Sequence, residues 1–242
     1  MHSIWLGEYL GTLILVLLGS GANASVTLRK TYAQDAGWMV VATGWALAVL
    51  CGILTAQAFG SPAAQLNPAI ALSSAIVSGD FSHLALNSSA QFLGAMTGCT
   101  LTWLIFLPHW TVTPDPHAKL GVFCTSPAIP HLPANLLSEA LGTFVLVLVA
   151  GAIASPGVAP RGLASGLAPW LVASLVWSIG LSLGATTGYA INPARDLGPR
   201  IMHALLPIAG KGSSNWAYAA VPFVGDLAGA ALAGILLRLA HL

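Results

Sequence analysis

The chain has 242 residues, of which 56% are hydrophobic and only 6% are charged, and its mean hydropathy is +0.82. A soluble domain carries about 25% charged residues, so this composition excludes a soluble protein and indicates one embedded in a lipid bilayer. The formal net charge of +1 argues against a nucleic-acid partner. The three cysteines and seven histidines show no ligand spacing, so we expect no disulfide framework, metal site or cofactor.

A helix that crosses a bilayer needs about 20 mostly apolar residues. Six segments meet this requirement: 3–24, 37–58, 83–107, 135–155, 163–184 and 216–240. The first ends in Ala22-Asn23-Ala24, which resembles a signal-peptide cleavage site. We still expect a retained span, because no Lys or Arg precedes it, Glu8 lies at its start, and its pattern recurs in mid-chain.

Two further apolar segments, 67–77 and 193–203, are too short to cross a bilayer. As helices of about eleven residues they would reach roughly 16 Å, which is half of the required length. One follows the second span and the other follows the fifth. The longest connection, 108–134, contains six prolines, and we expect it to be a loop outside the membrane.

The two halves of the chain repeat each other. The stretch Gly7-Glu8-Tyr9-Leu10-Gly11-Thr12 returns as Ser138-Glu139-Ala140-Leu141-Gly142-Thr143, and Asn67-Pro68-Ala69 returns as Asn192-Pro193-Ala194. We predict one all-α channel domain over 1–242, with a first repeat over 1–107, a connecting loop over 108–134 and a second repeat over 135–242. Each repeat has three transmembrane helices and one re-entrant half-helix. Because three is odd, the second repeat is inverted in the membrane, as in many transport proteins.

Each Asn-Pro-Ala triplet predicts a helix start, since Asn is a favoured N-cap and Pro is favoured at the first helical position. Two such starts can meet at the bilayer midplane, where their positive dipole ends repel protons and cations. The oxygens of Asn67 and Asn192 cap their own helices, which leaves the amide N–H groups free to point into a lumen. The non-helical residues before each start are tolerated only beside protein or a wet cavity. We expect their carbonyls to form an acceptor track: Ala64, Gln65, Gly188 and Ala190.

Arg195 lies in the first turn of the second half-helix, at membrane depth, where a charge is costly and usually functional. A functional Arg195 would donate two hydrogen bonds to a passing solute and repel cations. The alternative is a structural one, in which Arg195 pairs with Asp196 or extends its charge to the membrane surface.

The doubled triplet, the two Glu-x-x-Gly-Thr openings and the stretch from Gly188 to Arg200 resemble the major intrinsic protein family, which comprises the aquaporins and the glycerol facilitators. The resemblance covers the whole chain, and Asp196 after the arginine resembles the aquaglyceroporin branch. It implies a homotetramer in a bacterial plasma membrane, with both termini cytoplasmic. The positive-inside rule alone would place the N-terminus outside, because most Lys and Arg residues fall in loops on the other side.

The resemblance also implies a selectivity filter at four positions: Trp45, Gly180, Tyr189 and Arg195. Water-selective relatives usually place His where Gly180 stands, so the opening here should be wider. Trp45 and Tyr189 would offer aromatic faces to the C–H groups of a polyol, and Arg195 would meet its hydroxyls. The alternative for both aromatic residues is an ordinary core or interfacial position.

Several acidic and amide residues remain. Glu8 and Glu139 are expected to be structural and to accept backbone N–H groups of the re-entrant loops, with proton coupling as the alternative. Gln65 stands where the family often has His, so pH gating through this residue is not expected. Asp226 stands where the sixth span usually reads Gly-Pro. We expect a hydrogen-bonded helix contact there, and a polar patch at the lumen or a subunit interface is the alternative.

These features predict a passive channel, not an enzyme, for glycerol and other small uncharged solutes. The expected solutes are glycerol, water, dihydroxyacetone, urea, hydrogen peroxide and undissociated lactic acid. A coupled secondary transporter is the main alternative, since inverted repeats and broken helices also suit it. A scaffold with a vestigial pore is a third. Gly225, Gly229 and Gly234 in the last span should allow close helix packing.

Overall fold

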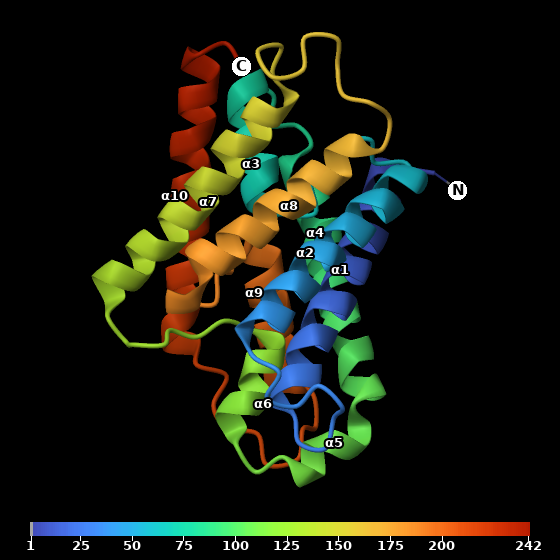
Figure 1. The fold of residues 1–242 in the computed structure, drawn as a ribbon, viewed down its shortest axis with the longest axis vertical. Coiled ribbons are helices and arrows are strands. Elements are labelled where there is room, and N and C mark those ends of the chain that lie inside the picture. The colour runs from blue at the N-terminus through green and yellow to red at the C-terminus, as the bar shows by residue number, and fades with distance from the viewer. Residues whose placement is uncertain (1) are drawn as a thin grey trace.

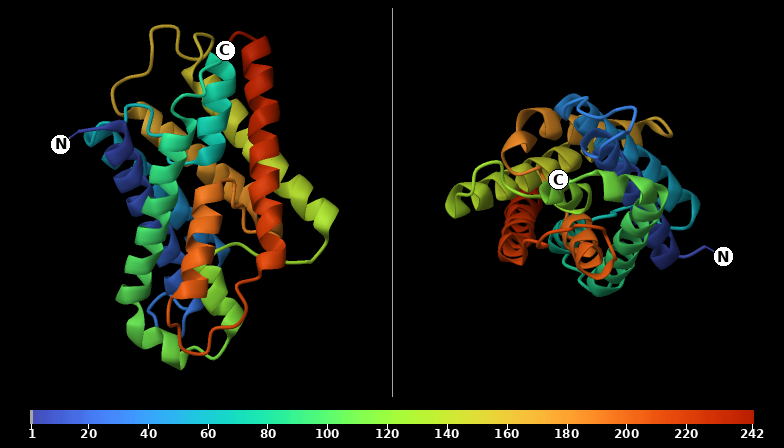
Figure 2. Two further views of the ribbon diagram at one scale, coloured as in Figure 1. Left: turned by 180° about the vertical axis from the view of Figure 1, so that it is seen from behind. Right: turned by 90° about the horizontal axis from the view of Figure 1, so that it is seen from below.

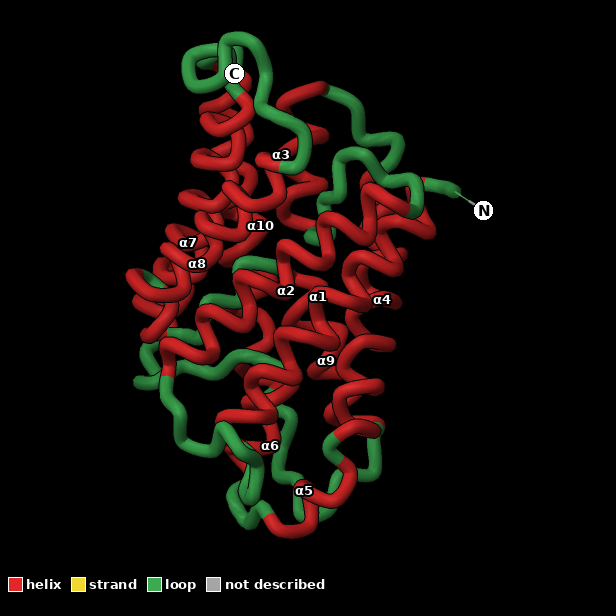
Figure 3. The backbone as a smooth tube through the Cα atoms, turned by 45° about the vertical axis from the view of Figure 1, so that its right-hand side comes forward, coloured by secondary structure: helices red, strands yellow, loops and turns green. Residues whose placement is uncertain are grey.

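The computed structural model describes residues 2–242, and within that range it is a bundle of helices joined by loops, without strands (Figures 1 and 3). The longer helices are α1 (Ile4–Thr27), α2 (Trp38–Ala58), α4 (Leu84–Ile105), α7 (Leu132–Ala154), α8 (Leu167–Ser182) and α10 (Trp216–Leu239). The shorter ones are α3 (Pro68–Ser78), α5 (Leu107–Val112), α6 (Pro116–Phe123), α9 (Pro193–Leu205) and the 3₁₀ turn η1 (Gly184–Thr186).

Among the described residues, four helices are long and apolar enough to cross a membrane by those criteria alone: α1, α2, α7 and α10. The other two predicted spans also form helices beside them. α4 has 22 residues but carries polar side chains such as Asn87 and Gln91 that lie buried within the protein. α8 has only 16 residues, or about 24 Å of helix, and η1 extends it. It begins at Leu167, four residues later than predicted, after Gly166 at φ +77°.

The half-helices α3 and α9 have the predicted start residues, and they extend from the middle of the bundle toward opposite ends (Figure 2). α3 packs mainly against α10 and α4, and α9 packs against α4, α10 and α6. The first residues of α1 and the last of α10 both lie in the upper part of Figure 1. This arrangement puts the two helix starts, rather than the two helix ends, at the centre of the molecule.

Glycines set the closest helix crossings. A Cβ on Gly94 of α4 would lie 2.4 Å from the carbonyl oxygen of Tyr9 in α1, and one on Gly229 of α10 would lie 2.1 Å from that of Ala140 in α7. Gly225 and Gly234 likewise face Glu139 and Ser73. The predicted close packing of the last span is therefore packing within one chain, against α7 and α3.

The prediction of a plain loop over 108–134 was wrong in part, because this stretch contains most of α5, all of α6 and the start of α7. Its prolines stand at helix starts rather than in helix interiors. Pro116 follows Asp115, whose carboxylate accepts from the His117 N–H at 2.8 Å, so the two residues begin α6. The apolar side of α6 is buried against α1 and α9.

Candidate functional site

Asn67 and Asn192 each join the two halves of the chain. Asn67 Oδ1 accepts from the Ala69 N–H at 2.8 Å, and its Nδ2 donates to the Ile191 carbonyl at 2.7 Å. Asn192 Oδ1 accepts from Ala194 and Arg195 at 3.0 and 3.2 Å, and its Nδ2 donates to the Leu66 carbonyl at 2.9 Å. The capping role is as expected. The expectation that all the amide N–H groups stay free was wrong, since one on each Asn crosses to the other loop and one remains.

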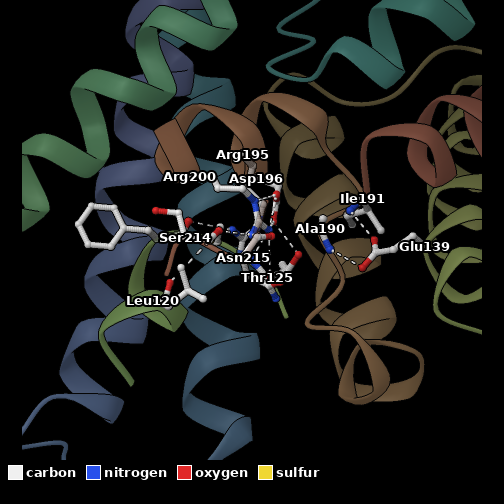
Figure 4. Close-up of polar contacts among 12 residues, drawn as sticks. Leu120, Thr125, Glu139, Ala190, Ile191, Arg195, Asp196, Arg200, Ser214 and Asn215 are labelled. Atoms are coloured by element: carbon white, nitrogen blue, oxygen red, sulfur yellow. Dashed lines mark hydrogen bonds and ion pairs between the residues drawn. The ribbon is translucent and has the colours of Figure 1, made fainter. Parts of the chain in front are cut away.

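Two buried glutamates hold these loops. Glu8 accepts from the backbone N–H groups of Gln65 and Leu66 at 2.8 and 2.7 Å, and also from the Ser61 hydroxyl and the Gln91 amide at 2.6 and 2.8 Å. Glu139 accepts from the backbone N–H groups of Ala190 and Ile191 at 3.2 and 3.1 Å (Figure 4). A carboxylate has enough acceptor sites for all these donors, so each glutamate satisfies N–H groups that lipid could not.

The same loops carry unusual backbone conformations. Ala64 and Leu66 in the first loop have φ of 42° and 54°, and Tyr189 and Ile191 in the second have 38° and 42°. Such angles cost about 1–3 kcal/mol for residues other than glycine and persist only when the surroundings enforce them. Here the hydrogen bonds to Glu8 and Glu139 enforce them.

A cavity of about 240 Å³ runs along both loops. Its polar wall includes the two capping asparagines, Gln65 and Arg195, and apolar side chains of α1, α2, α7 and α8 form much of the rest, among them Leu15, Ile53, Leu146 and Val176. Of the expected acceptor residues, Ala64, Gln65 and Ala190 line this cavity, whereas Gly188 does not. Pro68, Ala69, Pro193 and Ala194 also lie outside its wall. The cavity therefore offers one polar side and one apolar side.

Trp45 and Arg195 meet in this cavity. The Arg195 guanidinium carbon lies 4.0 Å from the centre of the Trp45 ring, which is a cation–π contact. Trp45 Nε1 donates to Asn23 Oδ1 at 2.9 Å, and Asn23 Nδ2 donates to the Gly121 carbonyl at 2.7 Å. Gly19 leaves the space for the indole, since a Cβ there would lie 2.3 Å from it. One face of Trp45 is thus taken by the guanidinium rather than left for a solute.

Tyr189 occupies the space next to Gly180. A Cβ on Gly180 would lie 2.9 Å from the phenol carbon and oxygen of Tyr189, and one on Gly184 would lie 2.5 Å from its ring. Trp38 packs edge-on against the ring and donates its Nε1–H to the Gly180 carbonyl at 2.9 Å. The Tyr189 hydroxyl is buried without a hydrogen-bond partner among residues 2–242. The absent side chain at Gly180 therefore makes room for Tyr189, which is a correction to the simple picture of a wider opening.

Asp196 pairs with Arg200, not with Arg195. Arg200 donates from Nε and Nη2 to Asp196 Oδ1 at 3.0 and 2.8 Å, and Thr125 donates from its N–H and hydroxyl to Asp196 Oδ2 at 2.7 and 2.6 Å (Figure 4). Arg195 makes one long hydrogen bond, from Nη1 to the Phe123 carbonyl at 3.5 Å. The alternative in which Arg195 pairs with Asp196 was wrong, and most of the Arg195 donors have no partner in the described chain.

Two further polar residues have definite places. Gln65 Oε1 accepts from Asn87 Nδ2 at 2.9 Å, which orients the Gln65 side chain in the cavity wall. Asp226 is fully buried outside the cavity, and one of its oxygens accepts from the Thr143 hydroxyl at 3.2 Å. It is a hydrogen-bonded contact between α10 and α7, as expected, and not a lumenal patch.

Sequence reasoning missed the residues that hold the aromatic side chains. Asn23 fixes Trp45, Gly19 makes room for it, and Trp38 and Gly184 confine Tyr189. The available signal was Asn23 itself, because a polar amide within an apolar span needs a buried partner.

Comparisons with known proteins agree with this geometry. The chain matches the family model described as Major intrinsic protein over residues 2–237. It is 49% identical over 238 residues to the glycerol uptake facilitator protein of Bacillus subtilis, covering 97% of this chain and 83% of the relative. It is 50% identical over 234 residues to glycerol uptake facilitator protein 3 of Lactiplantibacillus plantarum, covering 96% and 94%.

The fold is also similar to a solved structure. The X-ray structure of the aquaglyceroporin from Plasmodium falciparum superposes with a TM-score of 0.83 at 25% identity, covering 97% of this chain and 94% of that one. The predicted fold of six transmembrane helices and two re-entrant half-helices is confirmed by this likeness.

Proposed function

This chain belongs to the major intrinsic protein family, and from its cavity we propose how it conducts small neutral solutes. It is a membrane protein and a passive channel for glycerol and similar uncharged molecules, not an enzyme. The observation that carries the mechanism is the pair of opposed helix starts at Asn67 and Asn192 in a cavity with one polar and one apolar side. A polyol presents hydroxyls along one side and C–H groups along the other, so it matches both walls.

The same helix starts explain ion exclusion. Each contributes a positive partial charge of about half a unit, and Arg195 adds a full one. A cation or hydronium ion meets repulsion there, and no carboxylate in the cavity wall compensates within the described chain. Coupled transport has no support, because the glutamates that could carry protons are outside the wall and bonded to backbone N–H groups.

We assign the selectivity filter to Trp45, Gly180, Tyr189 and Arg195. Arg195 keeps unpaired donors for solute hydroxyls, the apolar ring of Tyr189 faces the C–H side, and Trp45 holds the guanidinium in place. Gly180 sets the position of Tyr189 and thereby the width. The free N–H of each capping asparagine is the next donor along the path, and the Ala64, Gln65 and Ala190 carbonyls are the acceptors.

Finer features extend this function. We propose that water, dihydroxyacetone, urea, hydrogen peroxide and undissociated lactic acid also pass, that four copies assemble with one pore each, and that 1–107 and 135–242 are the inverted repeats. Because the relatives named above are bacterial proteins, we propose that the membrane is the bacterial plasma membrane.

We propose cytoplasmic termini in spite of the loop charges. Lys211 donates to the carbonyls of His203, Ala204 and Leu206 at 2.7 Å each, Lys119 donates to the Ala209 carbonyl, and Arg200 is bonded to Asp196. The positive-inside rule counts these three cations as evidence against cytoplasmic termini. Because all three are bonded to groups within the fold, they weigh less in that count.

Stopped-flow light scattering on proteoliposomes tests the function. We expect glycerol flux to rise linearly with the glycerol gradient and to ignore an imposed proton gradient. A flux that follows the proton gradient would establish coupling instead. Empty liposomes give the background flux, and Arg195→Leu, which removes the proposed solute donor, is the control for the filter.

A further inference from the structure

The two buried glutamates have equivalent surroundings with one difference. Gly94 lies against the Tyr9 carbonyl and Gly229 against the Ala140 carbonyl, and Tyr9 and Ala140 each follow one of the glutamates directly. Gln91 stands three residues before Gly94, and Asp226 stands three residues before Gly229. Gln91 and Asp226 therefore occupy matching positions on α4 and α10, each facing a glutamate.

The bonds made at these positions differ in chemistry. Gln91 Nε2 donates to Glu8 Oε2 at 2.8 Å, which an amide can do at any pH. Asp226 holds the matching place beside Glu139, because its neighbour Gly225 faces that residue and a Cβ on Gly225 would lie 2.9 Å from the Glu139 Cβ. Two ionised carboxylates can only accept, so no hydrogen bond can form between them unless one carries a proton.

The surroundings of Asp226 demand a neutral group. The residue has no exposed surface, and its Oδ2 is without a partner among residues 2–242. Among the helices packed against α10, α7 contributes the charged Glu139, α9 contributes Arg195, Asp196 and Arg200, and α3 contributes no titratable group, while Tyr218 lies on α10 itself. Arg200 is already bonded to both oxygens of Asp196. Within residues 2–242 no cation is bonded to Asp226 or to Glu139, and two neighbouring buried carboxyls without a bonded cation hold one proton between them.

We propose that Asp226 is a positioning residue that holds a proton and donates it to Glu139, so that the second re-entrant loop is fixed by a carboxylic acid–carboxylate pair. Glu139 then keeps its charge for the N–H groups of Ala190 and Ile191. These two residues follow Tyr189 directly, so the proton fixes the backbone that carries this filter residue. The first loop obtains the same support from the amide of Gln91.

Infrared spectroscopy of the purified channel at neutral pH tests the proton directly. We expect a carbonyl stretch of a neutral carboxylic acid that shifts when aspartate is labelled with ¹³C and disappears in Asp226→Asn. Asp35→Asn, at an exposed carboxylate, is the matched control and should leave the band unchanged. A spectrum without the band, or a band that ignores the aspartate label or survives Asp226→Asn, overturns the proposal.

Glycerol flux tests the positioning role, and this arm rests on the proposed channel function. Asp226→Asn should keep flux within about twofold, because an amide N–H donates at any pH, whereas Asp226→Leu should lower it about tenfold by removing one buried partner. Equal flux in both variants overturns the positioning role. Size-exclusion chromatography establishes that each variant is folded, and Asp226→Ala, which likewise cannot donate, replaces Asp226→Leu if that variant does not fold. A parent channel without glycerol flux would refute the function and leave the infrared result intact.

Discussion

Glu8 accepts four hydrogen bonds at 2.6 to 2.8 Å, two of them from side chains, whereas the backbone bonds that Glu139 accepts are longer, at 3.1 and 3.2 Å. The half-helices differ in the same sense. α3 contains no ionisable residue, while α9 contains Arg195, Asp196 and Arg200, all buried. One loop is thus a tightly fixed support with neutral partners, and the other combines support with the charges to which we assign solute selection.

The largest expected effect concerns the charged half-helix. Asp196→Ala leaves Arg200 buried without its partner, and breaking such a pair costs about 3–5 kcal/mol. We expect a large loss of folded protein, measured by size-exclusion chromatography after heating in detergent. Ala71 is the matched position on α3, four residues after Asn67 as Asp196 is after Asn192. Ala71→Gly should cost only about 1 kcal/mol, and equal losses would contradict the contrast between the half-helices.

The glutamates should differ in their tolerance of an amide. Glu8→Gln leaves two of four donors without an acceptor, at about 1–3 kcal/mol each. Glu139→Gln should cost less, because in the proposed pair its new N–H group can donate to the Asp226 carboxyl. Thermal unfolding of the two purified variants in one detergent compares them. If Glu139→Gln lost more thermal stability than Glu8→Gln, the second loop, and not the first, would be the more tightly held one.

Gly180→His tests the filter. The new side chain meets Tyr189 at 2.9 Å and must displace it, so we expect glycerol flux to fall at least about tenfold, the equivalent of about 1.4 kcal/mol, with a smaller loss of water flux. Parallel stopped-flow measurements with the two solutes give the ratio. Gly21→Ala is the control, since a Cβ there meets nothing within 4 Å. Equal loss of both fluxes would place the narrowest point elsewhere.

The smallest expected effect comes from the hydroxyl of Tyr189. It is buried without a partner, so Tyr189→Phe removes no hydrogen bond within the described chain. We expect thermal stability to be unchanged or slightly raised, and glycerol flux to change by less than about fivefold, or 1 kcal/mol. A larger fall in glycerol flux at constant water flux would identify the hydroxyl as a direct solute contact.

Local patterns predicted the features that depend on nearby residues. Each Asn-Pro-Ala triplet capped a helix because cap chemistry needs only adjacent residues, and the repeat placed Glu8 and Glu139 beside the loops they support. The pair of Asp196 and Arg200 is also local, since the two residues are four apart on α9, a spacing that favours an ion pair. Local patterns could not show that the carbonyls of Thr125 and Ser214, from two other loops, complete the bonding of Arg200.

The same limit applies to the space around the filter. Gly180 was read as an empty position, yet whether it is empty depends on where Tyr189 points, and Gly184 and Trp38 decide that. The helices α5 and α6 were missed because prolines were taken as helix breakers, although Asp115 before Pro116 is a helix-start pattern.

The reciprocal bonds of Asn67 and Asn192 have a consequence for biosynthesis. Asn67 bonds to a carbonyl 124 residues further along the chain, and Asn192 to one 126 residues back. The nascent first half therefore carries an unpaired amide in the membrane until the second loop has been translated and inserted, so maturation of the lumen is a late, post-insertion event with high contact order. We therefore expect two fragments divided between 107 and 135 to form a lumen only when they are expressed together.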